Sequence, residues 1–439
     1  MSSSEPLNPF WGGLLYNSCL PLQVTLNYCG QCVYCFADLA DPDRKNSPRP
    51  VLELLRTFRD RNKDGTYKRK SYTAHLLREG YPVVASNLVD PLSKTNYKAF
   101  APIQAAMELQ GVPYSIQTKV GHDVKPAYEV LRRCKKPLIW YISVTTLLDD
   151  RRKSIEPGAS AIPDRLQFIQ DARAAGHRVL VGINPVIPDN IPDPEALIGE
   201  LKRRGVEGIW VQGLHLSANK QQNLGLYGKK ALGEEVLEAA KKPLEWSECL
   251  DTIEAIRVAA DRAAMPHYDS QQGGTTSYFD PYRETYRRTF PLMQDFVNYC
   301  HQNKAAGDLI YWQEFVGFFE DKLPRGYWSL REHLCAIAHR MSLIGLEIPQ
   351  QMTYGGVEAF HVQDIVARQK RDRTPLLLEI WKWKETIICP ANVECFAWIG
   401  SWETQKGGSK GWTQYLDDDG LPILRFCPDG SDGSAFVEY

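Results

Sequence analysis

The chain of 439 residues has no long uninterrupted apolar run, and its mean hydropathy is -0.37. A membrane-spanning helix needs about 20 consecutive apolar residues, so none is predicted. An excess of either charge is also missing, because 52 Lys and Arg residues stand against 53 Asp and Glu residues. This balance argues against nonspecific coating of nucleic acid, although a local basic groove is compatible with it.

The N-terminal residues lack the basic segment followed by an apolar segment that marks a secretory signal. We therefore expect a cytoplasmic protein with reduced thiols. The number of cysteines, 11, is odd, so at least one stays unpaired in any disulfide scheme. With 43% hydrophobic and 24% charged residues, the composition is that of a globular chain and excludes disorder.

The first half of the chain alternates short apolar segments with amphipathic ones. The apolar segments are rich in Val and Ile, which is typical of parallel strands buried on both faces. The candidate strands are Leu22–Leu26, Pro82–Ser86, Tyr114–Thr118, Leu138–Val144, Arg178–Ile183 and Gly208–Gln212. The candidate helices between them are Ala101–Gln110, Lys125–Cys134, Pro163–Ala175 and Pro194–Arg204. This alternation predicts an α/β fold, either a parallel sheet or a partial barrel.

The alternation ends near residue 225, and helical patterns followed by a Trp-rich tail take its place. The helices expected there are Gly233–Lys241, Trp246–Ala264, Phe290–Asn303 and Ser329–Leu346. Met265–Asp280 is predicted to be a polar loop because it contains two adjacent glycines and few apolar residues. We therefore predict an α/β domain over residues 1–225 and a helical, then mixed, domain over residues 226–439.

Three cysteines stand within seven residues directly after the first candidate strand: Cys29, Cys32 and Cys35. Thiolates bind zinc and iron–sulfur clusters. A zinc ribbon would require a second cysteine pair, whereas three ligands suit a cluster with one open iron. The plain alternative is three structural cysteines beneath a loop. A metal site is favoured over it because free cysteines seldom gather this tightly.

In this motif and after later strands, the chain resembles the radical S-adenosylmethionine (SAM) superfamily, and within it the spore photoproduct lyase branch. The matching segments are Tyr34 with Phe36 and Ala37, Ser86–Pro91, Thr118–Lys119, Ser143–Thr146, Glu156–Pro163 with Arg165, and Asn184–Pro188. The resemblance covers residues 15–215, and each of these segments follows an expected strand. It implies a partial (β/α)6 barrel with a C-terminal helical and mixed substrate domain.

The resemblance also implies the cofactors and the residues that hold them. Cys29, Cys32 and Cys35 would hold a [4Fe–4S] cluster whose fourth iron binds SAM. The SAM-contacting residues it implies are Tyr34, Ser86, Asn87, Asp90, Lys119, Ser143 and Asn184. Reductive cleavage of SAM would give a 5′-deoxyadenosyl radical that abstracts hydrogen from a substrate carbon. The implied partners are an electron donor such as flavodoxin or ferredoxin, and a nucleic acid or modified nucleotide, but no membrane.

Two features of this sequence depart from the branch. The spacing is C-x2-C-x2-C in place of C-x3-C-x2-C, so either the loop is one residue shorter or Cys19 replaces Cys29 as a ligand. The shorter loop is favoured because Cys19 lies on the far side of the first expected strand. The stretch before Asp90 also lacks the hydrogen-donating cysteine of that branch. This favours another reaction on a nucleobase, such as a lyase or isomerase step on a modified thymine in DNA, in repair or base hypermodification.

Two alternatives remain open. One is a radical SAM enzyme that modifies a peptide or small molecule and holds an auxiliary cluster through Cys389, Cys395 and Cys427. The other is a zinc-dependent nucleic-acid-binding protein that keeps the barrel as a scaffold.

Charged segments elsewhere suggest where a nucleic acid would bind. They are Arg56–Lys70, Ala367–Arg373 and Tyr282–Arg288, the last of which interleaves Tyr with Arg. Cations suit phosphates and aromatic rings suit stacked bases, although such segments are more often solvated faces. Glu156 and Arg165 are predicted to form an ordinary surface ion pair, and His215 is more often structural than catalytic.

Overall fold

The computed structural model describes part of the chain. The described residues are 20–22, 29, 32–35, 49–69, 72–85, 89–214, 216, 226–242, 245–269, 280–289, 293–311, 313–314, 317–318, 322, 396–404, 410–418, 423–428 and 436–438. They fall into two compact units, each of which is described by itself. In these ranges, no helix has both the length and the apolarity that crossing a membrane requires.

The first unit is built on a seven-stranded sheet in which all neighbouring strands run parallel. Its strands are β1 (Leu20–Leu22), β2 (Val83–Ala85), β3 (Tyr114–Thr118), β4 (Ile139–Ser143), β5 (Arg178–Val186), β6 (Gly208–Gly213) and β7 (His267–Asp269). They lie in chain order from one edge of the sheet to the other. The carboxyl ends of parallel strands therefore lie side by side, which is where α/β proteins place their sites.

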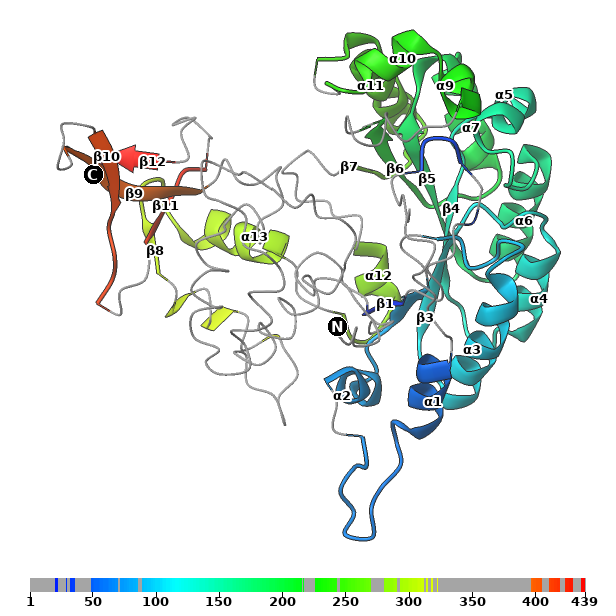
Figure 1. Cartoon of the computed structure of the whole chain (residues 1–439), viewed down its shortest axis with the longest axis horizontal. Coiled ribbons are helices and arrows are strands. Elements are labelled where there is room, and N and C mark those ends of the chain that lie inside the picture. The colour runs from blue at the N-terminus through cyan, green and yellow to red at the C-terminus, as the bar shows by residue number, and fades with distance from the viewer. Residues whose placement is uncertain are drawn as a thin grey trace. The chain divides into compact units, whose positions relative to one another are not determined.

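Helices accompany this sheet, and those before β7 lie in the connections between its strands. They are α1 (Arg49–Thr57), α2 (Tyr72–Glu79), α3 (Tyr97–Gln110), α4 (Lys125–Arg133), α5 (Asp149–Ile155), α6 (Ile162–Ala174), α7 (Pro194–Arg203), α9 (Leu226–Leu232), α10 (Glu234–Ala239), α11 (Ser247–Arg262) and α12 (Asp280–Thr285), with a short 3-10 turn at Pro188–Asn190. Figure 1 shows α3, α4 and α6 side by side along one face of the sheet. The predicted α/β class is confirmed, and the sheet with its covering helices is that of a partial barrel.

The core of this unit lies between the strands and the helices that cover them. Trp140 of β4 is fully buried, and its ring meets that of Phe168 on α6 edge to face, with centroids 4.9 Å apart. The α6 helix then ends before Gly176, whose φ of 85° lies in the left-handed region that glycine adopts without strain. The chain can thus turn directly from α6 into β5.

The structure corrects one expectation about this sheet. Met265–Asp280 was expected to be a loop, but His267–Asp269 forms β7, which pairs in parallel with β6. The strand is only three residues long and contains no apolar alternation, so its sequence carries no strand pattern. The sheet therefore has seven strands where six were predicted. The division of the chain into domains at residue 225 stays a prediction, although β7 and α11 belong to the first unit.

In its described residues, the second unit combines helical segments with a small sheet. Its elements are α13 (Met293–Asn303), β8 (Leu309–Ile310), β9 (Phe396–Thr404), β10 (Lys410–Gln414), β11 (Leu424–Phe426) and β12 (Phe436–Glu438). The strand order is β10-β9-β11-β8 with antiparallel pairs, and β12 pairs with β9 in parallel. Phe296, Phe396 and Phe426 pack together in its core. The helix predicted at Ser329–Leu346 lies outside the described residues.

Replacing Phe168 by Ala should destabilise the first unit. The substitution leaves a cavity against Trp140 and Tyr128, whose ring centroids lie 4.9 Å and 5.2 Å from that of Phe168. Buried Phe-to-Ala substitutions cost about 3–5 kcal/mol in the free energy of unfolding. Urea denaturation followed by circular dichroism would measure the loss. Leu109→Ala is the control, because this side chain on α3 is 76% exposed; an equal effect of both substitutions would contradict the assigned core.

Candidate functional site

The candidate site lies at the carboxyl ends of β2, β3 and β4. Asp90, which follows β2, is buried, and its carboxylate accepts hydrogen bonds from the backbone N–H groups of Leu92 at 2.8 Å and Lys119 at 2.6 Å. The hydroxyl of Thr118 donates to both carboxylate oxygens at 2.9 Å. Burial raises the pKa of Asp90, and these hydrogen bonds oppose the rise. Asp90 therefore ties the end of β3 to the loop after β2.

The backbone turns sharply just after Lys119. Val120 and Gly121 have φ values of 59° and 70°, and a Cβ at Gly121 would lie 2.2 Å from the carbonyl oxygen of Leu92. Only glycine fits such an approach without displacing the neighbouring loop. Ser160 holds the turn from the other side, since its N–H donates to the Gly121 carbonyl at 2.8 Å and its hydroxyl to the Lys119 carbonyl at 3.1 Å. The backbone conformation at Lys119, the residue directly after β3, is thus fixed.

Glu156, which follows α5, is a carboxylate with no exposed surface. Its Oε1 accepts hydrogen bonds from Lys119 Nζ at 2.7 Å, from Thr145 Oγ1 at 3.0 Å and from the hydroxyl of Tyr34. Its Oε2 lies 2.7 Å from Nη1 of Arg165, which is also fully buried. Lys119, Glu156 and Arg165 form a buried ion triad, named so below.

The electrostatics of Glu156 follow from these contacts. Burial alone would raise the pKa of this carboxyl group, but the charges of Lys119 and Arg165 and the hydrogen bonds from Lys119 and Tyr34 hold it well below its ordinary value. Glu156 is therefore an anion at any physiological pH. With Oε1 hydrogen-bonded and Oε2 beside the Arg165 guanidinium, it is suited to hold its partners in place rather than to take up a proton.

Arg165 is held by hydrogen bonds in addition to its ion pair with Glu156. Its Nε donates to the carbonyl of Ser160 at 2.9 Å and its Nη1 to the carbonyl of Ser143 at 3.1 Å. Nη1 therefore donates to Ser143 and also pairs by charge with Glu156. Its buried Nη2 has no hydrogen-bond acceptor among the described residues.

The cysteine loop is attached to this triad. The N–H of Val33 donates to the carbonyl of Ile155 at 2.9 Å, which places the loop beside Glu156. Tyr34 is buried, donates its hydroxyl proton to Glu156, and accepts a hydrogen bond from Lys119 Nζ at 3.1 Å. The Lys119 ammonium also lies 5.4 Å from the centre of the Tyr34 ring. The residue between the last two cysteines is therefore bound directly to the triad.

The thiols themselves are close to this charge. The side chains of Cys32 and Cys35 are hydrogen-bonded to each other, and this contact together with burial raises the pKa of Cys32, while the charge of Lys119 opposes the rise. Cys29 and Cys35 are half-buried and Cys32 is buried. Metal binding would replace the thiol protons.

The chemistry of these donors can be compared with the group they would hold. Across the described ranges, no three His, Cys, Asp or Glu side chains converge on one point as the ligands of a single ion do. Ligands of a cuboidal cluster bind different irons and therefore need not converge in this way. Three cysteines on one loop, beside a cation and at the carboxyl edge of a parallel sheet, fit an iron–sulfur cluster better than a lone zinc ion.

The other predicted SAM-contacting residues are placed less closely together. Ser143 ends β4, and its carbonyl binds Arg165. Asn184 lies on β5, where its side-chain amide donates to Gln212 at 3.1 Å, and the Asn184–Pro185 peptide bond is cis. Ser86 and Asn87 lie outside the described residues, as do Cys19 and His215. The structure thus joins Tyr34, Lys119 and, through the backbone, Asp90; the SAM contacts of all seven residues stay predictions.

Two interpretations of charged residues were wrong. Glu156 and Arg165 were expected at the surface, yet both side chains are fully buried. The helical spacing of α6 could have predicted the burial of Arg165. This residue follows Ile162 by three residues and precedes Ile169 by four, which places it on the buried face of the helix.

The Tyr282–Arg288 segment was expected to offer aromatic rings to bases. Instead, Tyr282 and Tyr286 are 1% and 7% exposed, and the Tyr286 hydroxyl donates to the Tyr114 carbonyl at 2.6 Å. These rings belong to the core of the first unit and are not free to stack on bases. Of the other predicted binding segments, Ala367–Arg373 lies outside the described residues.

The cysteines proposed for an auxiliary cluster can be placed only in part. Cys427 is buried after β11, whereas Cys389 and Cys395 lie outside the described residues. A second metal centre therefore stays a prediction.

Comparisons with known proteins give distant relatives. No family model matches the chain. Uncharacterized proteins of Mycobacterium bovis and Mycobacterium tuberculosis are each 27% identical to it over 216 residues, which is 45% of this chain and 60% of the relative. The chain thus spans 60% of the length of the curated relatives that it matches.

Similar solved structures are also remote. Streptococcus suis SuiB bound to its precursor peptide SuiA has a TM-score of 0.38 at 15% identity, over 62% of this chain and 52% of that one. Spore photoproduct lyase with a dinucleoside spore photoproduct has a TM-score of 0.36 at 11% identity, over 55% and 72%. Methylornithine synthase has a TM-score of 0.34 at 11% identity, over 65% and 80%. TM-scores this low do not by themselves assign a family or an activity.

Replacing Arg165 by Met should strongly destabilise the first unit. The substitution leaves Glu156 buried with one cation fewer, and breaking a buried ion pair in this way costs about 3–5 kcal/mol in the free energy of unfolding. Arg203→Met is the matched control, because Arg203 pairs with Glu200 while its own side chain is 64% exposed. Such an exposed pair contributes only about 0–1 kcal/mol. Equal midpoints for the two variants in urea denaturation would show that the triad does not stabilise the fold.

Proposed function

We propose that the chain is a radical SAM enzyme. The observation that carries this proposal is the attachment of the three-cysteine loop to the strand ends, through Val33 N–H on Ile155 and through Tyr34 on Glu156 and Lys119. Thiols, a directed ammonium group and a buried aromatic ring meet where parallel-sheet enzymes bind their ligands. A [4Fe–4S] cluster with SAM would supply one-electron cleavage of the sulfonium and a 5′-deoxyadenosyl radical that abstracts hydrogen from substrate carbon.

Specific residues of this chain would serve that chemistry. Cys29, Cys32 and Cys35 would hold the cluster. Lys119 has three N–H donors, of which the described residues accept two, through Glu156 and Tyr34. The third would bind the SAM carboxylate. Tyr34 would pack beside the adenine, and Asp90 would keep the Lys119 backbone in position through its hydrogen bond.

For the substrate we propose a base within a nucleic acid, such as a modified thymine in DNA, in a lyase or isomerase reaction. With the Tyr282–Arg288 rings buried, the support comes from the resemblance and from the loop after α1. Residues 58–69, which follow α1, contain five basic and two acidic residues. Figure 1 shows this loop as the blue segment that extends beyond α1 and α2.

The loop after α1 is ordered by its own contacts. Arg61 and Tyr67 form an isolated antiparallel bridge, and the guanidinium groups of Arg61 and Arg78 each lie 4.1 Å from the Tyr67 ring centre. The side chains of Arg59 and Lys63 are left exposed. Exposed cations on an ordered support suit phosphates, whose contacts position a nucleic acid without reading its sequence.

Replacing Cys32 by Ala should abolish the iron–sulfur chromophore and SAM cleavage. Anaerobic reconstitution should give about four irons per chain in the unaltered protein, and about eight if an auxiliary cluster is present. Cys134→Ala is the control, because Cys134 precedes β4 and therefore lies toward the amino ends of the strands, away from the cysteine loop. Zinc in place of iron would favour the zinc-binding alternative. Retention of iron by Cys29→Ala together with its loss in Cys19→Ala would assign the third ligand to Cys19.

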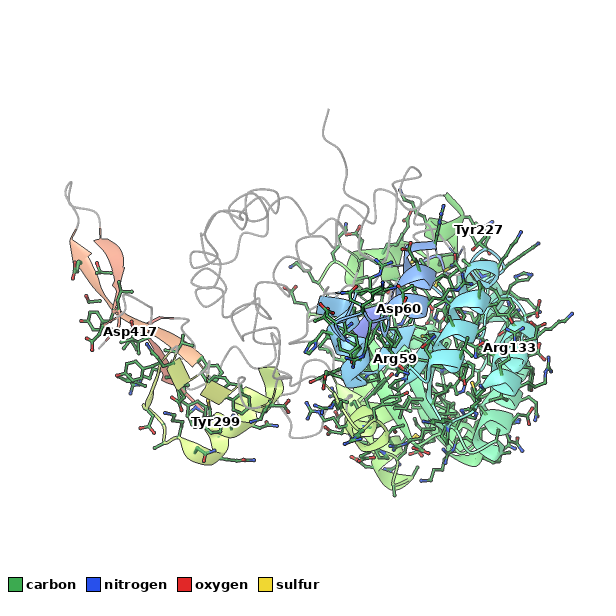
Figure 2. The ribbon with its side chains drawn as sticks, turned by 90° about the horizontal axis from the view of Figure 1, so that it is seen from below. Arg59, Asp60, Arg133, Tyr227, Tyr299 and Asp417 are labelled. Atoms are coloured by element: carbon green, nitrogen blue, oxygen red, sulfur yellow. The ribbon has the colours of Figure 1, made fainter. Side chains whose placement is uncertain are left out.

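Binding of an oligonucleotide should depend steeply on salt. The slope of log affinity against log salt approaches minus the number of phosphates contacted, about 0.9 per phosphate for duplex DNA. Arg59→Ala with Lys63→Ala should flatten this slope. Arg132→Ala with Arg133→Ala is the control, since these exposed residues end α4 on the outer helical layer, where Figure 2 labels Arg133.

Fluorescence anisotropy over a salt series would give these slopes. Salt-independent binding, or equal slopes in the two double variants, would remove the loop as a phosphate contact. If peptides increase the rate of deoxyadenosine formation and oligonucleotides do not, the peptide-modifying alternative replaces the nucleic-acid substrate.

A further inference from the structure

The buried ion triad carries unequal charge. Lys119 and Arg165 contribute two positive charges, and Glu156 contributes one negative charge. All three are withdrawn from water, since the side chains of Glu156 and Arg165 are fully buried and that of Lys119 is 12% exposed. Charges inside a protein are weakly screened and act over longer distances than surface charges. The excess positive charge therefore reaches whatever lies next to Lys119.

The neighbour of Lys119 is the cysteine loop. Its ammonium nitrogen lies 3.1 Å from the hydroxyl of Tyr34 and 5.4 Å from the ring centre, and Tyr34 stands between Cys32 and Cys35 in the chain. The Lys119 side chain is held in place because Glu156 binds its ammonium group at 2.7 Å and the Val120–Gly121 turn fixes the backbone next to it.

We propose that Lys119, held by Glu156 and Arg165, sets the reduction potential of the cluster on the cysteine loop. This inference rests on the proposed function, since it requires the cluster to be present. Reduction adds one electron to the cluster and makes it more negative, so a fixed cation beside it stabilises the reduced form. Glu156 has the opposite effect through its own charge. Lys119 would thus act on the electron transfer in addition to any contact with SAM.

The test is a redox titration of the reconstituted protein without SAM or substrate, with dithionite as the one-electron reductant and electron paramagnetic resonance as the readout. Lys119→Met should shift the midpoint to a more negative potential. Glu156→Gln should shift it to a more positive potential. At a fixed potential we expect at least about a tenfold change in the ratio of reduced to oxidised cluster, which is the effect of one charge about 12 Å away at an effective dielectric constant of about 20.

Two controls separate charge from structure. Lys119→Arg keeps the charge and should keep the midpoint. Thr145→Val removes the hydrogen bond of 3.0 Å to Glu156 without changing any charge, and should also leave the midpoint in place. Shifts of the same sign in Lys119→Met and Glu156→Gln, or no shift in either, would overturn the inference. If Glu156→Gln loses the cluster, equal midpoints for Lys119→Met and Lys119→Arg overturn it instead.

Failure of the proposed function gives a different result. In that case the unaltered protein holds no cluster after reconstitution, and no signal exists to titrate. The cluster could also form and cleave SAM while its midpoint potential stays the same in Lys119→Met. That result would leave the proposed function standing and remove only this inference.

Discussion

One buried carboxylate is the constraint on which the described site depends. Removing Glu156 from water costs several kcal/mol, and the fold offsets this cost only while cations and hydrogen-bond donors surround it. These partners come from separate places: Arg165 from α6, Lys119 from the end of β3, Thr145 from the end of β4, and Tyr34 from the cysteine loop. Satisfying a single charge therefore brings four segments of the chain together.

The fold could be predicted where both faces of a strand are buried. The apolar segment Leu138–Val144 contains β4 (Ile139–Ser143), because burial on both sides demands a continuous apolar run. β7 could not be found in this way. Its three residues are polar or aromatic, and what makes them a strand is backbone pairing with β6, a partner about sixty residues earlier in the chain. Backbone pairing leaves no mark on the side chains.

The site could be predicted in its chemistry but not in its contacts. Cysteine spacing and strand-end position pointed to the loop and to Lys119. The burial of Glu156 depends on Tyr34, which is 122 residues away in the chain. A local sequence pattern cannot predict a contact between residues so far apart. Tyr282 and Tyr286 misled for a different reason. Residues four apart share one face of a helical turn, so their alternation with Arg described a buried side and a solvated side rather than a binding surface.

The place of β1 in the sheet has a consequence for how the protein is assembled. β1 is an edge strand of three residues that pairs with β2 alone among the described strands. The loop that follows it is attached to the rest of the unit by the Val33 backbone and the Tyr34 side chain. Short edge segments open locally at a small cost, while central strands such as β4 open only on global unfolding. Under the proposed function, the cluster would therefore be inserted after folding, because this edge segment opens at a smaller cost than the central strands.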